Sequence, residues 1–564
     1  MKKKKRRERS RRERADTADA TDRVTFNLTE MRNAERLLEF RGDDLRYVGP
    51  WKMWLTWDGR RWKLDEDGGA LRYAKENAQV MAAEADVSVK NAQSTVDEEI
   101  EEDAESIASE EKKRGRPRKP KASTESLGML KSASAYKKWC EQSQNFRNLQ
   151  STLSVAACDK SVALVHDQLD THHFLFNVEN WTINLKTGKK QPQSRDDLIT
   201  KVAAVEFHSK AKCPLWDKFV REAMGGDMEL VGYLKRFVGY SLTGSTEEQA
   251  LVFFWGSGNN GKSTFLTTLY KIFGDYALRA ARGMLFRSKH GGERHPTTLV
   301  SLHGKRFVTC SEIDENQELD EGLTKDLTGS DPINARRMRE DEWVFLPTHK
   351  LFLAGNHKPR ITGTDKGIWR RNNLVPWTVA VAKDKVNKKL GDELLEEASG
   401  ILNWCIEGCM EWQERGLDPP EAVIEATKEY RKEQDVLGQF FDERLVFEEN
   451  ALAARADLRK IYEDWCEEFG YLPVGARKFA QALRELSVVD GYVWDPNKAQ
   501  SVDGWRGVRI ATKADRAKKE LERRGKQMSK KERRAFKTMV KKANKGAVKL
   551  RIVRNDETKS RGDR

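Results

Sequence analysis

The sequence predicts an α/β fold built on a parallel sheet, from segments that follow one another along the chain. A glycine-containing loop at 256–263 lies between an apolar run at 250–255 and a longer segment at 265–273. The apolar run has the length of a buried parallel strand, and the longer segment places its apolar residues at helical spacing. Further apolar strands are predicted at 306–310 and 351–354. The loop therefore joins one strand of a larger sheet to a helix.

The loop reads Gly-Ser-Gly-Asn-Asn-Gly-Lys-Ser, which is the full G-x-x-x-x-G-K-[ST] pattern of a phosphate-binding loop. In such a loop, backbone N–H groups and the N-terminus of the following helix face the phosphates of a nucleotide. Lys262 can reach the β and γ oxygens, and Ser263 can hold Mg²⁺. The sequence predicts a site for ATP and Mg²⁺ made by Gly256, Ser257, Gly258, Asn259, Asn260, Gly261, Lys262, Ser263 and Thr264.

Three further polar groups follow in an order suited to nucleotide hydrolysis. Glu312 comes just after the second predicted strand, where an acid can hold the Mg²⁺ shell and polarise water. Asn356 follows the third predicted strand, where an amide can contact the γ-phosphate or position the attacking water. Arg370 and Arg371 form a pair of the type that neutralises transition-state charge from a neighbouring subunit. Taken alone, Glu312 could be a surface acid and Asn356 a turn residue, but the ordered series favours catalysis.

These motifs resemble those of the superfamily 3 helicases, most closely the type at the C-terminus of phage and plasmid primases and the poxvirus primase-helicase. The resemblance implies an AAA+-like ATPase that forms a ring, usually a hexamer, and moves along single-stranded DNA. By motif, Lys262 and Ser263 match Walker A, Glu312 the Walker B acid, Asn356 the sensor, and Arg370 or Arg371 the arginine finger. Runs that carry the resemblance besides the loop are 302–312, 324–331, 347–350, 355–360 and 367–371.

One departure from the family pattern concerns the metal. Many superfamily 3 members have two adjacent acids at Walker B, whereas Ser311 precedes Glu312 here. The sequence leaves open whether Asp314 or Glu315 also binds the metal. Asp314 is the candidate for this third ligand, in addition to Ser263 and Glu312.

A β-hairpin is predicted between the acid and the sensor strand, because short strands at 333–338 and 343–346 flank a charged turn. In the family, such a hairpin points into the ring channel and its basic residues grip the DNA backbone. Arg336, Arg337 and Arg339 are the candidates for DNA contact. A solvated charged turn is the alternative interpretation.

Charge is concentrated at the two ends of the 564-residue chain, which has a formal net charge of +14 and a pI of about 9.2. Residues 1–14 carry ten Lys/Arg against two Glu, and residues 513–564 carry twenty-one Lys/Arg against seven acids. The summed charge of these two ends exceeds the net charge of the whole chain, so the residues between them carry a small net negative charge. Basic arms of this kind bind phosphates without reading bases. They could equally be solubilising tails or, at the N-terminus, a localisation patch.

A linker adds a third basic element. The acidic segment 97–111 has the composition of a disordered chain. It is followed by a basic stretch at 112–120 whose core, with Arg114 and Arg116, resembles an AT-hook that inserts arginines into narrow A·T minor grooves. A plain basic linker is the alternative.

The rest of the chain is assigned from hairpin and helix signals. Tryptophans alternate around an Asp-Gly turn between Trp51 and Trp62, which predicts a hairpin. Its tryptophans are expected to be core residues, and stacking on bases beside Arg60, Arg61 and Lys63 is the alternative. A second hairpin is predicted at 181–188. Helices at 458–469 and 476–486 precede strand-like segments at 491–494 and 505–510, which suggests a winged helix. The predicted organisation is a basic disordered arm (1–23), an α+β N-terminal domain in two parts (24–90 and 127–229) around a linker (91–126), the AAA+-like ATPase domain (230–435), a C-terminal winged-helix-like domain (436–511) and a basic disordered tail (512–564).

Several classes of protein are disfavoured. The seven cysteines show no C-x-x-C spacing, and no apolar run approaches the length of a transmembrane helix, so we expect a protein of a reducing cytoplasm, that of the bacterial host if phage-encoded. Cys405 and Cys409, one helical turn apart, are expected to be core residues. No pair of acids lies on an apolar strand that could hold the metals of a primase, so priming would fall to a separate primase or polymerase.

Together, the residues and the resemblance favour an ATP-dependent DNA helicase of phage or plasmid replication. It would act on single-stranded and forked DNA as a homo-hexamer, without its own primase site. An ATP-switched, DNA-binding replication initiator without unwinding activity is the main alternative. A packaging or kinase-type P-loop enzyme is the other, and the basic arms disfavour a kinase.

Overall fold

The computed structural model describes most of the chain between residues 28 and 519. The described residues are 28–110, 118–281, 283–287, 297–311, 313, 315, 317–336, 342–363, 366–381, 384, 386–489, 504–517 and 519. The N-terminal arm and most of the basic tail lie outside them, as do Arg114, Arg116, Glu312, Asp314, Arg337 and Arg339. The chain divides into two compact units, one of residues 1–360 with 365–426 and the other of residues 361–364 with 427–564.

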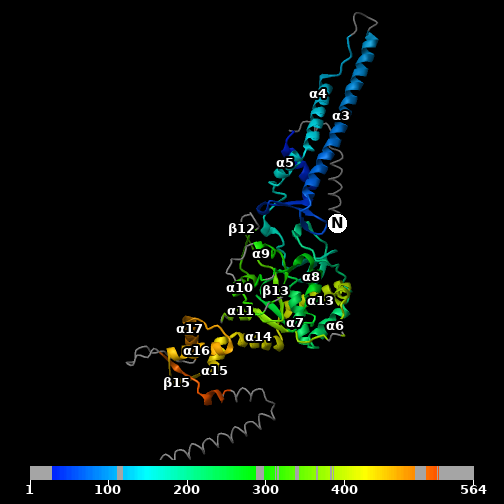
Figure 1. Cartoon of the computed structure of the whole chain (residues 1–564). Helices are drawn as coiled ribbons and strands as arrows, with labels where there is room; N and C mark the ends of the chain where they lie inside the picture. Colours follow the sequence, from blue (N-terminus) through cyan, green and yellow to red (C-terminus); the bar gives the residue numbers. More distant parts are fainter. Residues whose placement is uncertain are drawn as a thin grey trace, which may run out of the picture. The chain divides into compact units, whose positions relative to one another are not determined.

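A five-stranded parallel sheet forms the centre of the first unit (Figure 1). Its strands, in the spatial order β14-β8-β13-β10-β9, are β8 (Leu251–Trp255), β9 (Ala277–Arg279), β10 (Phe307–Ser311), β13 (Lys350–Gly355) and β14 (Asn372–Pro376). Both faces of β13 are buried, which explains why the predicted strands read as continuous apolar runs. The three predicted strands are confirmed as β8, β10 and β13, whereas β9 and β14 were not predicted.

Helices pack around this sheet and close its core. The helices of this part are α6 (Pro214–Ala223), α7 (Met228–Tyr240), α8 (Lys262–Phe273), α9 (Thr297–Val300), α10 (Glu321–Thr328), α11 (Lys366–Arg371), α12 (Leu390–Glu396) and α13 (Ala398–Arg415). The helices α12 and α13 are separated only by Glu397. The Glu397 carboxylate accepts hydrogen bonds from the backbone N–H groups of Leu215 (3.1 Å) and Trp216 (3.0 Å), and so caps α6.

Two glycines let α7 and α13 approach backbone to backbone. A Cβ added at Gly408 would lie 2.0 Å from the carbonyl oxygen of Lys235, and one at Gly239 would lie 2.1 Å from the backbone nitrogen of Cys409. Cys405 and Cys409 are buried in the same core, as predicted. The spacing of this helix pair is therefore fixed by the absence of side chains.

The N-terminal region of the first unit contains two small sheets. One, in the order β3-β2-β1-β4, consists of β1 (Leu45–Val48), β2 (Met53–Trp57), β3 (Trp62–Leu64) and β4 (Ala163–Leu164), and the other of β5 (Leu175–Asn177), β6 (Thr182–Asn184) and β7 (Lys189–Gln191). Strands β2 and β3 form the predicted hairpin, and β6 and β7 the second one. Trp51 and Trp62 are buried, which confirms them as core residues.

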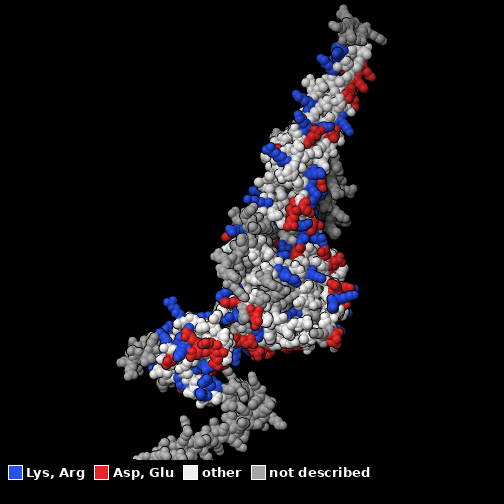
Figure 2. Space-filling view, in the orientation of Figure 1, with Lys and Arg blue, Asp and Glu red and all other residues white. Residues whose placement is uncertain are grey.

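The prediction of a disordered acidic segment is wrong. Residues 97–110 belong to α3 (Gly69–Glu110), which lies against α2 (Glu30–Arg41) and α5 (Phe146–Ala156) at its start and runs beside α4 (Thr124–Ser143) as a helical hairpin (Figure 1). Figure 2 shows side chains of both charge signs along this hairpin.

Local partners explain why the acidic sequence is helical. After its first residue α3 contains neither Gly nor Pro, and its alanines and glutamates favour helix. The Glu99 carboxylate accepts hydrogen bonds from the backbone N–H of Ser123 (2.8 Å) and the hydroxyl of Ser126 (2.6 Å) at the start of α4, and these bonds lower the pKa of Glu99. Asp103 pairs with Arg118 at 2.7 Å. Composition alone predicted disorder because it does not include these partners.

The second unit has its own aromatic core. The helix α14 (Glu421–Gln434) enters it, and the elements that follow are α15 (Val436–Arg444), β15 (Leu445–Ala454), α16 (Arg455–Phe469), α17 (Ala476–Val489) and β16 (Gly504–Ile510). Strands β15 and β16 pair antiparallel, and Phe440, Tyr462 and Phe479 pack between the helices. The predicted helices at 458–469 and 476–486 and the strand at 505–510 are confirmed, while 491–494 lies outside the described residues.

We expect Gly408→Ala to destabilise the first unit by roughly 1–3 kcal/mol or more, because the methyl group must force α7 and α13 apart. Gly391→Ala in α12 is the matched control, since no atom lies within 4 Å of its Cβ position. That control should change stability by no more than about 1 kcal/mol, in the stabilising direction. Differential scanning calorimetry of the two variants measures the difference, and equal melting temperatures would contradict the close packing described here.

Candidate nucleotide-binding site

The phosphate loop lies at the carboxyl end of β8 and leads directly into α8. Gly261, at the start of the helix, has φ +84°, a conformation that favours glycine. No side chain caps the N-terminus of α8, so its first N–H groups face the loop without a side-chain acceptor. Ser257, Gly258, Asn259 and Ser263 are exposed, and this part of the loop can meet a ligand.

Lys262 is buried within the loop and held by oxygen acceptors. Its ammonium Nζ donates to the carbonyl oxygen of Gly256 (2.7 Å) and to Oδ1 of Asn260 (3.0 Å), and it lies 3.5 Å from Oδ1 of Asn356. Burial lowers the pKa of Lys262. Asn356 follows β13, which pairs with β8, so the parallel sheet brings the predicted sensor amide beside the predicted Walker A lysine.

Trp377 and Asn260 hold the phosphate loop in place through hydrogen bonds to each other. The sequence did not indicate that these two residues pair. The indole N–H of Trp377 donates to the carbonyl oxygen of Asn260, and Nδ2 of Asn260 donates back to the carbonyl oxygen of Trp377 at 2.8 Å. The wholly buried Trp377 ring packs on Phe254 and Phe265, with centroids 4.9 and 5.4 Å away. Trp377 follows β14, and a tryptophan after an unpredicted strand gave no signal of this role.

The arginine pair lies at the opposite end of the sheet from the phosphate loop of its own chain. Strands β8 and β14 pair from Leu251 beside Asn372 to Trp255 beside Pro376, so Arg370 and Arg371 precede the amino end of β14. Five strand residues span roughly 17 Å. The structure therefore does not bring the arginines to the loop of the same chain.

The two arginines differ in their surroundings. Arg371 is buried and donates to the carbonyl oxygen of Gly367 (2.9 Å) and to Oε1 of Gln249 (3.1 Å). Arg370 is exposed and donates to the same Gln249 oxygen at 2.6 Å. Arg370 is thus the arginine that another molecule can reach.

Possible metal ligands are only partly described. The Ser263 hydroxyl is exposed at the start of α8, and β10 ends at Ser311, the residue before Glu312. Across the described ranges, no group of three or more His, Cys, Asp and Glu side chains could hold a metal ion. Glu312 and Asp314 lie outside those ranges, and their roles stay predictions.

The predicted hairpin is confirmed by the antiparallel pairing of β11 (Ile333–Arg336) with β12 (Glu342–Phe345). Arg336 is exposed on one face of the pair. On the other face the Trp343 ring contacts Trp51, His166 and His303, with centroid distances of 5.8, 4.9 and 5.1 Å. Aromatic packing thus fastens the hairpin to the N-terminal region.

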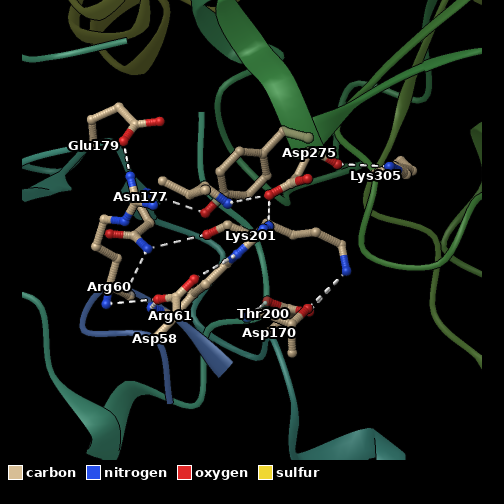
Figure 3. Close-up of polar contacts among 12 residues, drawn as sticks. Asp58, Arg60, Arg61, Asp170, Asn177, Glu179, Thr200, Lys201, Asp275 and Lys305 are labelled. Carbon is tan, nitrogen blue, oxygen red and sulfur yellow. Dashed lines mark hydrogen bonds and ion pairs between the residues drawn. The ribbon is translucent and has the colours of Figure 1, made fainter. Parts of the chain in front are cut away.

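A polar network also joins the N-terminal region to the end of the phosphate-loop helix (Figure 3). Asp275, two residues after α8, forms an ion pair with Arg61 and accepts a hydrogen bond from the backbone N–H of Val202 at 3.0 Å. Lys305 donates to the carbonyl oxygen of Asp275 at 2.8 Å. Nδ2 of Asn177 donates to the carbonyl oxygen of Arg60 at 2.9 Å. Both ends of α8 are therefore held by side chains far away in the sequence.

No helix in the described part of the chain is long and apolar enough to span a membrane.

Gly256→Ala should disrupt the loop, because its Cβ would lie 1.9 Å from the carbonyl oxygen of Trp377. We expect a lower melting temperature and ATP binding weaker by roughly 10- to 100-fold. Gly258→Ala is the control within the same motif, since nothing lies within 4 Å of its Cβ position, and it should keep the melting temperature. Equal melting temperatures for the two variants would show that Trp377 does not set the loop conformation.

Three family models match successive parts of the chain. Residues 34–225 match "D5 N terminal like", residues 254–371 match a "Family of unknown function (DUF5906)", and residues 432–513 match "Poxvirus D5 protein-like". The second match contains the phosphate loop, Asn356 and the arginine pair. The other two lie on either side of it.

The curated relatives are proteins of large DNA viruses. A protein named "Putative helicase" of Acanthamoeba polyphaga mimivirus is 25% identical over 302 residues, which cover 50% of this chain and 32% of the relative. Another protein named as a "Putative helicase", from Frog virus 3, is 26% identical over 290 residues, which cover 48% of this chain and 29% of the relative. A "Putative primase" of African swine fever virus is 25% identical over 283 residues, which cover 46% of this chain and 29% of the relative. The chain thus spans about a third or less of the length of these relatives.

Among solved structures, the apo form of the NrS-1 C-terminal region aligns with 57% of this chain and 88% of its own, at 12% identity and a TM-score of 0.33. A TM-score of this size does not establish a shared fold. The family models and the viral relatives confirm the resemblance that the motifs predicted. The chain carries D5 N-terminal-like and poxvirus D5-like domains and is similar to proteins of large DNA viruses that are named "Putative helicase" and "Putative primase", consistent with the superfamily 3 primase-helicase type.

Proposed function

We propose that the chain is an ATP-dependent DNA helicase of DNA replication that moves along single-stranded DNA as a ring, usually a hexamer, with priming left to another active site. The observation that carries this proposal is the placement of the arginine pair. Arg370 is exposed at one end of the sheet and the phosphate loop lies at the other, so an arginine finger can complete the site only of a neighbouring subunit.

The phosphate loop fits the triphosphate of ATP. The uncapped start of α8 supplies N–H donors, and Lys262 lies at the inner side of the loop with only neutral acceptors around it. A phosphate oxygen can replace the carbonyl of Gly256 as an acceptor for this ammonium. Lys262 would then hold the β- and γ-phosphates, while Asn356 orients the γ-phosphate or the attacking water.

Mg²⁺ would be held by the Ser263 hydroxyl and by the acids after β10, with Glu312 first and Asp314 second. Bound there, it would neutralise charge that builds up on the phosphates. Glu312 would also polarise the attacking water. Both acids follow a strand whose carboxyl end lies at the same edge of the sheet as the phosphate loop.

The two arginines would have different roles at the boundary between subunits. Arg370 would enter the neighbouring site as the finger, and Arg371 would position it, because both bind Oε1 of Gln249. The Arg371 guanidinium donates a hydrogen bond to the carbonyl oxygen of Gly367 in its own helix, and this bond restricts its movement.

DNA contact is proposed for the hairpin and the basic segments. Arg336, together with Arg337 and Arg339, would grip the DNA backbone in the ring channel. The basic arms, with Arg114 and Arg116, would add sequence-independent binding to phosphates. The second unit would act as a winged helix, since its elements follow one another as helix, strand, two helices and strand.

Lys262→Ala should abolish ATP hydrolysis, and Glu312→Gln should keep ATP binding but stop hydrolysis. Lys271→Ala, an exposed lysine on the same helix, should behave as the wild type. Strand displacement from forked DNA, measured beside ATPase activity, should be lost in both active-site variants. If the wild type hydrolyses ATP but never separates strands, the protein is an ATP-switched initiator and not a helicase.

Arg370→Ala should lower hydrolysis by about 10³-fold or more and leave nucleotide binding intact, because a finger acts on the transition state. Arg221→Ala, an exposed arginine on α6, serves as the control. Mixing inactive Arg370→Ala with inactive Lys262→Ala protein should restore part of the activity in mixed rings. No restoration at any ratio, with a monomer in light scattering under ATP, would mean that each chain completes its own site.

A further inference from the structure

A cavity of about 240 Å³ lies between the N-terminal region and the ATPase core, and it shares no lining residue with the phosphate loop. The N-terminal strands contribute Leu55 and Trp62 to its wall, and the ATPase part contributes Lys305 and Trp343 of β12. Three of its lining residues are tryptophans, the third being Trp51. Its other lining residues include two lysines, so the wall combines indole rings with cations.

The lysines of this wall are only weakly compensated by acids. The Lys201 ammonium lies 3.8 Å from Oδ2 of Asp170, and that carboxylate already accepts hydrogen bonds from the backbone N–H (2.7 Å) and hydroxyl (2.5 Å) of Thr200 (Figure 3). Lys305 donates to a neutral acceptor, the carbonyl oxygen of Asp275, at 2.8 Å. Within the described residues no carboxylate forms an ion pair with Lys305. A bound anion would supply the missing negative charge.

The electrostatics of Lys305 agree with this geometry. Burial, together with the nearby Lys201 and Arg61, lowers the pKa of Lys305 to about 8, and the Asp170 carboxylate only partly offsets this shift. An anion bound beside a lysine with a lowered pKa stabilises the charged form of that lysine.

The aromatic wall offers a different kind of contact. Trp343 is 7% exposed, and its indole N–H is buried with no acceptor in the described part of the chain. Indole rings stack on bases of any sequence, and an indole N–H can donate to an oxygen of the ligand. Ligand pockets usually measure roughly 300–1,000 Å³, so this smaller cavity accepts no more than one nucleotide unit.

We propose that this cavity binds a single nucleotide unit, with the phosphate between Lys201 and Lys305 and the base against Trp51 and Trp343. The unit is either a free nucleotide or one residue of a single-stranded DNA that also meets the hairpin β11–β12. Binding here does not require ATP hydrolysis and stands independently of the proposed helicase activity. An occupant would contact the N-terminal strands and the hairpin at the same time.

The test uses the full chain carrying Lys262→Ala, which removes the phosphate-loop lysine from the measurement. The probes are thymidine monophosphate, an oligothymidylate and inorganic phosphate. Acylation of lysine amines followed by mass spectrometry reports protection of Lys305 itself. Lys63 is the internal control, because it alternates with the lining residues Trp62 and Leu64 on β3 and is exposed. Calorimetry then compares Lys305→Met with Lys63→Met in the same background.

We expect protection of Lys305 but not of Lys63, and affinity for the protecting probe roughly 10- to 100-fold weaker in Lys305→Met than in Lys63→Met. Protection by thymidine monophosphate identifies a free nucleotide as a ligand, and protection by the oligothymidylate alone identifies DNA. Lys305→Met removes a buried charge, so it should fold, and its melting curve checks this. The proposal is overturned if no probe protects Lys305, if inorganic phosphate protects as well as the nucleotide, or if the two variants bind equally.

Discussion

The contact between Trp377 and the phosphate loop is the constraint on which the rest of the site depends. The loop must leave β8, turn at Gly256 under the carbonyl of Trp377, and start α8 with a free N-terminus. Reciprocal hydrogen bonds with Asn260 hold this arrangement, and Asn260 in turn accepts from Lys262. Because Trp377 follows β14, the shape of the loop depends on the edge strand being in register. The same strand begins directly after Arg371, so one strand connects the loop to the arginine pair.

The N-terminal region is anchored on this core and does not form a separate compact unit. Arg61 reaches Asp275 beyond the far end of α8, while Trp51 packs on Trp343 of the hairpin. The match to a D5 N-terminal-like model ends at 225, yet the packing continues across that boundary. The phosphate-loop helix and the hairpin are thus both braced by the same N-terminal strands.

Much of the fold could be predicted because the central strands are buried on both faces and read as apolar runs. β14 could not, since it starts with two asparagines and ends with a proline, and its place in the sheet is set by pairing with β8. Without β14, the sequence could name the arginine pair but not locate it. The nearness of Lys262 and Asn356 follows from strand pairing, which their sequence order already suggested. The end of α3 could not be predicted from acidic composition, because composition does not include partners such as Ser123 and Ser126, which hold Glu99.

The aromatic contact between Trp51 and Trp343 has a consequence for how the protein is made. The two residues are separated by more than half of the chain, and a ribosome adding roughly 5–20 residues per second reaches the second roughly 15–60 s after the first. Throughout that interval Trp51 lacks the Trp343 ring that packs on it, whereas Leu45 of the adjacent strand can already be buried against α2, α3 and α5. The segment around Trp51 should therefore gain its full protection from protease only after the hairpin β11–β12 has been synthesised.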